Sequence, residues 1–256
     1  MSTGLASELD RLAGVPGLLV ALDFDGVLAP LVDDPSSSRP LPASAEAVRT
    51  LAGLAGTTVV MVSGRGREDL ASVSGFGAPV RLVGSHGSEF DPALAASLGR
   101  GEFLSPDQRD RRAALIEDLQ PLVDDVAGAR LEIKPAGAAV HVRGVDPAAG
   151  TALLDRVRTG AATRDGVDAT EGKDVVDLAV LRTTKGSAVH ALRAHLRVDA
   201  VLFAGDDVTD ESVFTRLSGR DVGIKVGDGD TAATHRVAGP EEIADALTHL
   251  ARARTR

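Results

Sequence analysis

The segment Leu18-Leu19-Val20-Ala21-Leu22-Asp23-Phe24-Asp25-Gly26 passes from five apolar residues directly into two acidic ones. Such an uninterrupted apolar run is typical of a parallel strand that is buried on both faces. Open α/β sheets place their ligand sites at the carboxyl ends of the strands, which is where Asp23 and Asp25 fall. A tight turn rich in Asp would also explain this short pattern, so it indicates a site only together with further signals.

Four more apolar runs of the same kind follow, and they alternate with segments of helical spacing. The predicted strands are residues 57–62, 80–83, 200–204 and 222–226. The predicted helices are residues 44–54, 67–73, 185–196 and 209–217. This alternation favours a doubly wound, Rossmann-like α/β core with a parallel sheet.

The middle of the chain has a different pattern. A predicted helix at residues 107–126 is followed by alternating strands at 129–134 and 138–143, and then by another helix and two more strands. Alternating strands indicate an antiparallel sheet with one face on helices and the other open to solvent or ligand. We therefore predict a core of residues 1–102 and 180–256, with an inserted, smaller α+β cap domain at residues 103–179.

Composition excludes several classes of protein. The 256 residues carry a formal net charge of −9, and no block of basic residues is present, which disfavours nucleic acid as a partner. Tyr and Trp are absent and only six Phe occur, so aromatic platforms for stacking bases cannot be built in number. The chain has no Cys, which excludes disulfides, thiolate metal sites and a cysteine nucleophile.

No targeting or membrane segment is predicted. Residues 1–17 lack a basic region, and Asp23 interrupts the first apolar run before it could serve as a signal sequence. No stretch approaches the roughly 18 apolar residues of a membrane span. We expect a cytoplasmic protein and, because no heptad pattern is present, a monomer.

A second acidic cluster, Gly205-Asp206-Asp207-Val208-Thr209-Asp210-Glu211, follows another apolar strand. Capping of the next helix would explain Asp210 and Glu211, but it explains Asp206 and Asp207 less well. A hard cation with oxygen ligands would explain all of these carboxylates together. Since thiols are absent, Mg²⁺ suits the cluster better than Zn²⁺.

Two smaller elements complete the pattern: Ser63-Gly64-Arg65 after the second strand, and Lys185-Gly186 at the start of a helix. Taken singly, a helix-capping Ser and a surface Lys are the more ordinary explanations. Their order along the chain, however, resembles the four motifs of haloacid dehalogenase-like phosphatases: Asp-x-Asp, then Ser, then Lys, then Asp-Asp.

The chain also resembles trehalose-6-phosphate phosphatases over nearly its whole length. The segments that carry the resemblance are Leu22 to Gly26, Val62 to Arg65, Gly84-Ser85-His86-Gly87-Ser88-Glu89, Leu131-Glu132-Ile133-Lys134, Gly205 to Glu211, and Gly223-Ile224-Lys225-Val226-Gly227. This resemblance implies a hydrolase core whose cap is inserted between the second and third motifs.

The resemblance implies a role for each core motif. Asp23 is the expected nucleophile, and Asp25 the acid that protonates the leaving sugar oxygen and then activates water. Ser63 and Lys185 are expected to bind phosphoryl oxygens, while Gly64 lets the backbone approach the phosphate and Arg65 reaches either phosphate or sugar. The expected metal site consists of the side chains of Asp23 and Asp206, the backbone carbonyl of Asp25, and Asp207 and Asp210 ordering its waters or the loop.

Sugar recognition is expected from the cap, where Glu132 and Lys134 lie on the same face of one strand. A cross-strand ion pair on a solvated sheet is the alternative for these two residues. His86 and Glu89 match another family segment near the sugar, although a turn histidine is the more ordinary explanation of His86 alone. Many relatives carry Glu where this chain has Asp177. Because Asp is one methylene shorter, the ligand or the strand would have to shift for Asp177 to contact a sugar hydroxyl.

We therefore expect Mg²⁺-dependent hydrolysis of trehalose 6-phosphate to trehalose and phosphate. The first alternative is another sugar phosphate, such as sucrose phosphate or mannosyl-phosphoglycerate, because a fold does not determine a substrate. A non-catalytic phosphoacceptor is the remote alternative. The second Asp and the predicted cap argue against it, since a regulatory acceptor needs neither.

Overall fold

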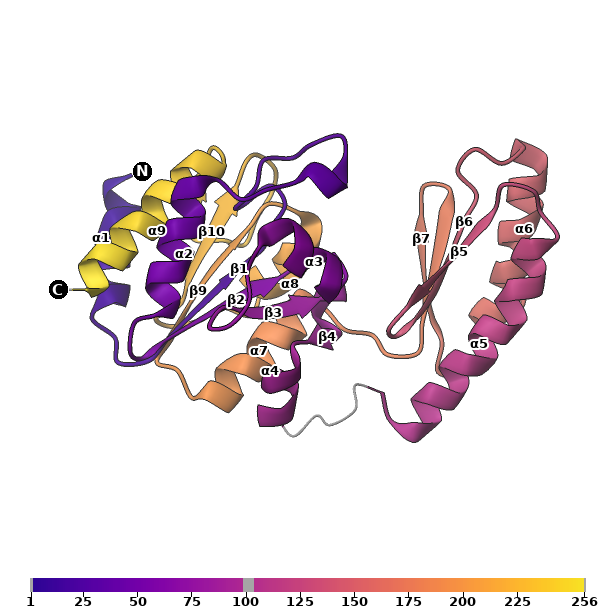
Figure 1. Ribbon diagram of the computed structural model, residues 1–256, viewed down its shortest axis with the longest axis horizontal. Coiled ribbons are helices and arrows are strands. Elements are labelled where there is room, and N and C mark those ends of the chain that lie inside the picture. The colour runs from indigo at the N-terminus through magenta and orange to yellow at the C-terminus, as the bar shows by residue number, and fades with distance from the viewer. Residues whose placement is uncertain (1, 99–103, 256) are drawn as a thin grey trace. The chain divides into compact units, whose positions relative to one another are not determined.

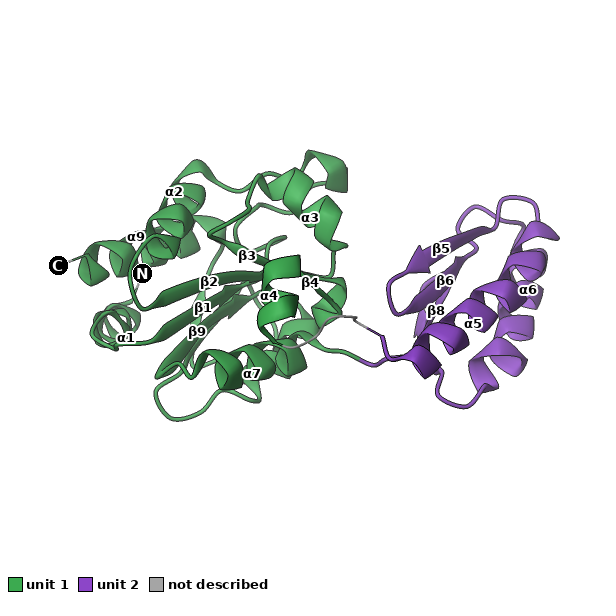
Figure 2. Cartoon of the chain, turned by 60° about the horizontal axis from the view of Figure 1, so that its bottom comes forward, with its two compact units in different colours: residues 1–99, 183–256 green, residues 100–182 purple. Residues whose placement is uncertain are grey.

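A computed structural model describes residues 2–98 and 104–255. The chain divides into two compact units, Met1–Gly99 with Thr183–Arg256, and Arg100–Arg182 (Figure 2). One predicted boundary, between residues 102 and 103, lies outside the described residues. Because the second unit is inserted into the first, the larger unit is built from both ends of the chain.

The larger unit is built on a mixed sheet that is parallel except at one edge (Figure 1). Among the described residues its strands, in spatial order, are β11 (His235–Val237), β10 (Val222–Val226), β9 (Ala200–Gly205), β1 (Leu18–Leu22), β2 (Thr57–Val62), β3 (Arg81–Gly84) and the antiparallel β4 (Glu89–Phe90). The first strand of the sequence therefore lies in the centre, between β9 and β2.

Helices cover both faces of this sheet. They are α1 (Thr3–Ala13), α2 (Pro42–Ala52), α3 (Arg67–Ser74), α4 (Pro92–Ser97), α7 (Lys185–Leu196), α8 (Glu211–Phe214) and α9 (Pro240–Arg254). Leu18, Val20 and Leu22 pack in the core with α1, α2, α3 and α9. Leu19 and Ala21 pack in the core with α4, α7 and α8. Since alternate residues of a strand point to opposite faces, both faces of β1 are buried, and the predicted doubly wound α/β core is confirmed.

The predicted helix at 209–217 is wrong in extent. A 3₁₀ turn, η4 (Val208–Asp210), precedes the four-residue α8. The reason is that the Asp210 carboxylate accepts hydrogen bonds from the backbone N–H groups of Asp206 and Asp207, which tightens the first turn. Helices α1 and α9 were not predicted from the sequence pattern; they lie at opposite ends of the chain and pack against each other.

The smaller unit consists of a four-stranded antiparallel sheet with helices on one face. Its elements are α5 (Pro106–Asp124), β5 (Arg130–Lys134), β6 (Gly137–His141), α6 (Pro147–Thr159), β7 (Asp168–Gly172) and β8 (Val175–Ala179), and the strand order is β5-β6-β8-β7. Val140, Val176 and Leu178 pack against apolar residues of α5 and α6. The alternate residues of the same strands form the other, more polar face.

Within the described residues, no helix combines the length and the apolar character that crossing a bilayer requires.

Arg254, in the last turn of α9, ties the two ends of the larger unit together. Its Nη1 donates hydrogen bonds to the carbonyl oxygens of Leu12, Ala13 and Val15, at 3.1, 3.0 and 2.8 Å. These carbonyls lie at the carboxyl end of α1, where helices leave acceptors without partners and favour a positive charge. One guanidinium thus satisfies the end of α1 and anchors α9 against it.

We predict that Arg254→Ala lowers the free energy of unfolding by about 2 kcal/mol, because hydrogen bonds to a charged group are lost and carbonyls are left without partners. The midpoint of thermal unfolding, followed by circular dichroism, should fall by roughly 6 °C. Arg252→Ala, at an exposed position of the same helix, serves as the control. Equal midpoints for the two variants would contradict the assigned role of Arg254.

Candidate active site

The residues predicted to carry the chemistry of the core converge at the carboxyl ends of neighbouring parallel strands. Asp23 follows β1, Ser63 follows β2 and Asp206 follows β9, while Lys185 opens α7. Because β1 lies between β2 and β9, the first carboxylate stands at the centre of this edge of the sheet. This is where an open α/β sheet places a ligand site.

Lys185 is the buried cation of the site. Its Nζ donates to Asp23 Oδ2 at 2.6 Å and to Asp210 Oδ1 at 2.9 Å, and its side chain is 2% exposed. The other oxygen of Asp23, Oδ1, accepts the backbone N–H of Phe24 at 2.7 Å. Both oxygens of Asp23 are therefore held in place by donors.

The charges of this cluster act strongly on one another because they are buried. Burial raises the pKa of Asp23 to about 7, and the charge of Asp210 adds to this effect against the opposing charge of Lys185. Burial would lower the pKa of Lys185, but the charges of Asp23 and Asp210 outweigh it and raise this pKa to about 12. The Lys185 ammonium therefore stays charged. Its single positive charge does not balance the negative charges of the neighbouring carboxylates.

The donor set fits a divalent cation. One oxygen each of Asp23, Asp206 and Asp210 lie within 4.8 Å of one another. The Oδ1 atom of Asp206 is buried and has no hydrogen-bond partner, and burial together with the charge of Asp210 raises the pKa of Asp206 to about 6. A hard cation with oxygen ligands would satisfy this oxygen and offset the repulsion.

Gly26 makes room for the Asp206 carboxylate. A Cβ atom at position 26 would lie 2.1 Å from Asp206 Oδ2, and the residue has a φ of +73°. Both the space and the backbone conformation thus require glycine here. The close approach brings Asp206 against the backbone that follows Asp25.

The remaining acidic residues of the second cluster serve different purposes. Asp210 is fully buried and contacts Lys185, whereas Asp207 is exposed and its Oδ1 accepts the backbone N–H of Thr209 at 2.7 Å. Asp207 therefore caps η4. Lys225, to which the sequence analysis gave no separate role, is buried on β10 and donates from Nζ to the carbonyl oxygen of Asp206. A lysine inside an otherwise apolar strand was the signal that could have revealed it.

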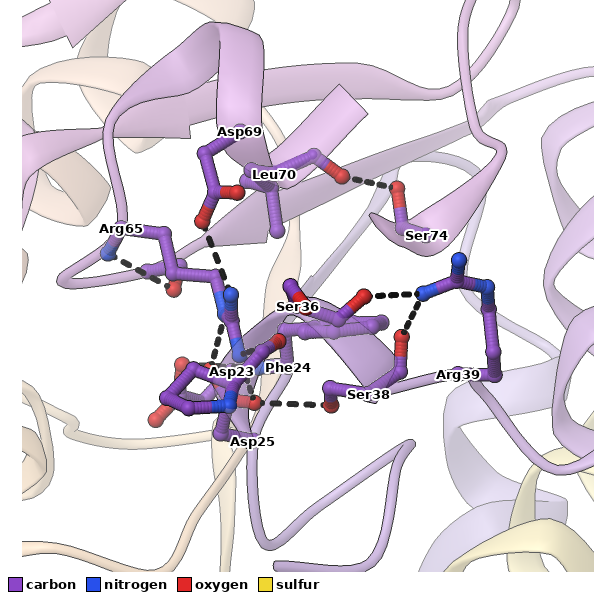
Figure 3. A network of polar contacts seen from close by, with 12 residues as sticks. Asp23, Phe24, Asp25, Ser36, Ser38, Arg39, Arg65, Asp69, Leu70 and Ser74 are labelled. Carbon is purple, nitrogen blue, oxygen red and sulfur yellow. Dashed lines mark hydrogen bonds and ion pairs between the residues drawn. The ribbon is translucent and has the colours of Figure 1, made fainter. Parts of the chain in front are cut away.

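Asp25 lies in a separate polar network (Figure 3). Arg65 Nε donates to Asp25 Oδ2 at 2.5 Å, and Arg65 Nη2 donates to Oδ1 at 2.8 Å. Arg65 also pairs with Asp69, in the first turn of α3, at 2.8 Å. The paired charges hold the guanidinium and the Asp25 carboxylate in a fixed bidentate arrangement.

The segment after β3 packs against the second motif. The His86 ring lies against Gly64, where a Cβ would come within 2.6 Å of it, and the backbone N–H of His86 donates to the Ser63 carbonyl. Glu89 accepts hydrogen bonds from Ser85 Oγ and from the backbone N–H of Arg67 at the start of α3. His86 and Glu89 thus hold this edge of the site together, and their contact with a sugar stays a prediction.

The smaller unit gathers its predicted ligand residues on one face of its sheet. Glu132 lies opposite Ala139, which lies opposite Asp177, and Lys134 is two residues further along β5. Lys134 forms an ion pair with Asp177, and His141 Nε2 lies 2.7 Å from Glu132 Oε2. An ion pair between strands, the alternative explanation considered for this strand, is present for Lys134, whose partner Asp177 lies on β8.

Comparison with known proteins connects this site to a family. A family model for trehalose-phosphatase matches residues 21–240, which include both acidic motifs, Ser63, Lys185 and the whole inserted unit. The chain belongs to the trehalose-phosphatase family. The predicted resemblance is confirmed.

Relatives of this trehalose-phosphatase family member include longer proteins. A bifunctional trehalose-6-phosphate synthase/phosphatase of Thermoproteus tenax is 35% identical over 225 residues, which cover 86% of this chain and 30% of the relative. A trehalose-phosphate phosphatase of Mycobacterium avium is 34% identical over 279 residues, covering 98% of this chain and 66% of the relative. The chain therefore spans less than two thirds of the length of either relative.

Solved structures agree on the fold. A trehalose-6-phosphate phosphatase of Aspergillus fumigatus is similar with a TM-score of 0.67 at 22% identity, covering 96% of this chain and 97% of that one. A haloacid dehalogenase-like hydrolase from B. subtilis gives a TM-score of 0.57 at 16% identity, covering 90% and 98%. The predicted α/β core with an inserted, smaller α+β unit is thereby confirmed as the fold.

We predict that Asp206→Asn stabilises this trehalose-phosphatase family member when no metal is bound. The raised pKa of Asp206 means that the folded state binds a proton more tightly than the unfolded state, so stability falls as pH rises through about 6. Removing the charge at pH 8 in EDTA should recover about 1 kcal/mol after allowance for solvent screening, or roughly 2 °C in the unfolding midpoint.

The same variant should lose most of the stabilisation that Mg²⁺ confers on the wild type in a thermal-shift titration. Asp228→Asn is the control, because it removes an exposed carboxylate that lies outside the proposed metal site. A full Mg²⁺ response in Asp206→Asn would contradict the assigned metal site.

Proposed function

We propose that the chain is a Mg²⁺-dependent phosphatase that hydrolyses trehalose 6-phosphate through an aspartyl-phosphate on Asp23. The observation that carries this proposal is that Asp23, Lys185, Asp206 and Asp210 lie together at one edge of the sheet, where Asp23, Lys185 and Asp210 are buried. Membership of the trehalose-phosphatase family and the names of the relatives support the substrate.

The first step is attack on phosphorus by a carboxylate oxygen of Asp23. Lys185 at 2.6 Å favours the ionised form that must attack, and Phe24 N–H orients the carboxylate from its other side. The new bond joins Asp23 to phosphorus, while the bond between phosphorus and the sugar oxygen breaks. Ser63, which is buried at the end of β2, would bind a phosphoryl oxygen.

Asp25 would move the protons of both steps. It gives a proton to the leaving sugar oxygen in the first step, and it takes one from water in the second, when water attacks phosphorus and Asp23 is released. Mg²⁺, held by Asp23, Asp206 and the backbone carbonyl of Asp25, would neutralise charge on the nucleophile and the phosphate and so let two anions approach. The role left to Asp207 and Asp210 is to order the loop or the waters around that ion.

Recognition of the sugar would come from the polar face of the smaller unit. Glu132, Lys134 and Asp177 present charged groups on neighbouring strands, and charged groups bind sugar hydroxyls well. Asp177 is one methylene shorter than the Glu of many relatives, and it pairs with Lys134. This pairing is the reason to keep a different sugar phosphate, such as sucrose phosphate, as the second candidate substrate.

We predict that the wild type releases phosphate from trehalose 6-phosphate in Mg²⁺ and loses this activity in EDTA. Asp23→Asn should lower kcat by at least about 10³-fold, because the nucleophile is removed. Asp25→Asn should lower kcat by about 10² to 10⁴-fold, the usual contribution of general acid-base catalysis. Malachite-green detection of phosphate measures both.

A panel of sucrose 6-phosphate and glucose 6-phosphate, assayed beside trehalose 6-phosphate, tests the substrate. Preference for another ester would retain the proposed chemistry and reject the proposed sugar. Unchanged turnover in Asp23→Asn would reject the chemistry itself.

We also predict that Asp177→Ala raises KM for the preferred sugar phosphate by about 10-fold, the equivalent of one lost polar contact, with kcat changed less than about 2-fold. The control is Glu171→Gln on the neighbouring strand β7, where the carboxylate pairs with Arg158. An equal rise in KM in both variants would show that Asp177 affects KM through the structure of the sheet and not by contacting the substrate.

A further inference from the structure

Ser38 is a fully buried polar residue in a loop that the catalytic proposal does not use. It lies in the segment of residues 34–39, between β1 and α2, and its exposed fraction is 0%. Its Oγ donates a hydrogen bond to Asp25 Oδ1 at 2.9 Å (Figure 3). A buried hydroxyl group needs a partner, and here the partner is the proposed acid itself.

The two oxygens of Asp25 are held unequally. Oδ1 accepts from Ser38 Oγ and from Arg65 Nη2 at 2.8 Å, whereas Oδ2 accepts from Arg65 Nε at 2.5 Å. A carboxylate oxygen has two lone-pair sites in the plane of the group. Among the described residues, both sites of Oδ1 have a donor and one site of Oδ2 has none, so that site can carry a proton.

We propose that Ser38 is a positioning residue that, together with Arg65, anchors Asp25 Oδ1 so that Oδ2 is the oxygen that exchanges the proton. This inference rests on the proposed function, since it assigns the working atom of the acid. During cleavage of the ester, the Oδ2–H bond breaks as the proton passes to the sugar oxygen. In the second step Oδ2 takes a proton from the attacking water.

The loop is built to hold Ser38 still. The Asp34 carboxylate accepts hydrogen bonds from the backbone N–H and the hydroxyl of Ser36, and Ser37 Oγ donates to the Asp34 carbonyl at 2.7 Å. Arg39 Nη1 donates to the carbonyl oxygens of Ser36 and Ser38. The Ser38 hydroxyl is therefore preorganised toward Asp25.

The loop contacts the anchor at a second point. Arg65 Nη2, which donates to Asp25 Oδ1, also donates to the Pro35 carbonyl oxygen at 2.9 Å. The same short segment thus holds both the carboxylate and the guanidinium that pairs with it. A hydroxyl that only satisfied its own burial would not require this shared arrangement.

The test compares leaving groups. A sugar alkoxide must be protonated as it leaves, whereas p-nitrophenolate leaves readily without a proton, so an ill-positioned acid slows only the first reaction. The value of kcat/KM reports steps up to the first irreversible one, which isolates the acid step from the later hydrolysis. Ser38→Ala is assayed with p-nitrophenyl phosphate and with whichever sugar phosphate the wild type cleaves fastest. Ser74→Ala is the control, because its hydroxyl is also buried but donates to the Leu70 carbonyl oxygen in α3 rather than to Asp25.

We expect Ser38→Ala to lower kcat/KM for the sugar ester by about 10-fold and to change it less than about 2-fold for p-nitrophenyl phosphate, a difference that one good hydrogen bond can produce. Ser38→Thr, which keeps the hydroxyl, should restore part of the loss. Loss of equal size with both esters, or no loss with either, would overturn the proposal.

A second readout does not depend on activity. The side-chain Nε–H resonance of Arg65 in ¹H–¹⁵N spectra, assigned by its disappearance in Arg65→Lys, should shift in Ser38→Ala and stay in place in Ser74→Ala. An unmoved resonance in Ser38→Ala would show that the hydroxyl does not hold this pair. If the wild type prefers an ester other than trehalose 6-phosphate, the proposed substrate fails while the comparison of leaving groups still decides the role of Ser38.

Discussion

The arrangement of the larger unit depends on the buried pairing of Lys185 with Asp23 and Asp210. Three carboxylates at one sheet edge repel one another, and burial makes their ionisation costly. One ammonium, 2% exposed, offsets part of that charge. The charge that remains explains why a divalent cation suits the site, and why the chain brings Lys185 back to this edge from beyond the inserted unit.

Around this centre, each loop at the sheet edge supplies a different function. The loop after β9 turns Asp210 inward and leaves Asp207 to cap the turn, so two carboxylates three residues apart have different roles. The loop after β1 carries Asp25, and the segment that contains Ser38 folds back to hold it. The strands fix where the charged residues lie, and the short loops determine how their side chains are oriented.

The alternation of its strands separates the apolar core of the smaller unit from the polar face on which we propose that the sugar is recognised. One face packs Val140, Val176 and Leu178 against helices, and the other carries Glu132 and Asp177 on the same row. Polar residues on that second face can change without loss of the apolar core. Under the proposed function, such a division would allow recognition of the sugar to change while the fold is kept.

Sequence alone determined the buried strands β1, β2 and β10, the helix α7 and the order of the motifs, because uninterrupted apolar runs and strand-end carboxylates are local signals. It missed the length of α8, the anchoring by Arg254, and the parts played by Lys225 and Ser38. Those depend on contacts between segments distant in the chain, such as residues 254 and 12 or 225 and 206. Only the tertiary structure decides such contacts. The sequence gives the same residue type whether a polar side chain is solvated or bonded to a buried partner.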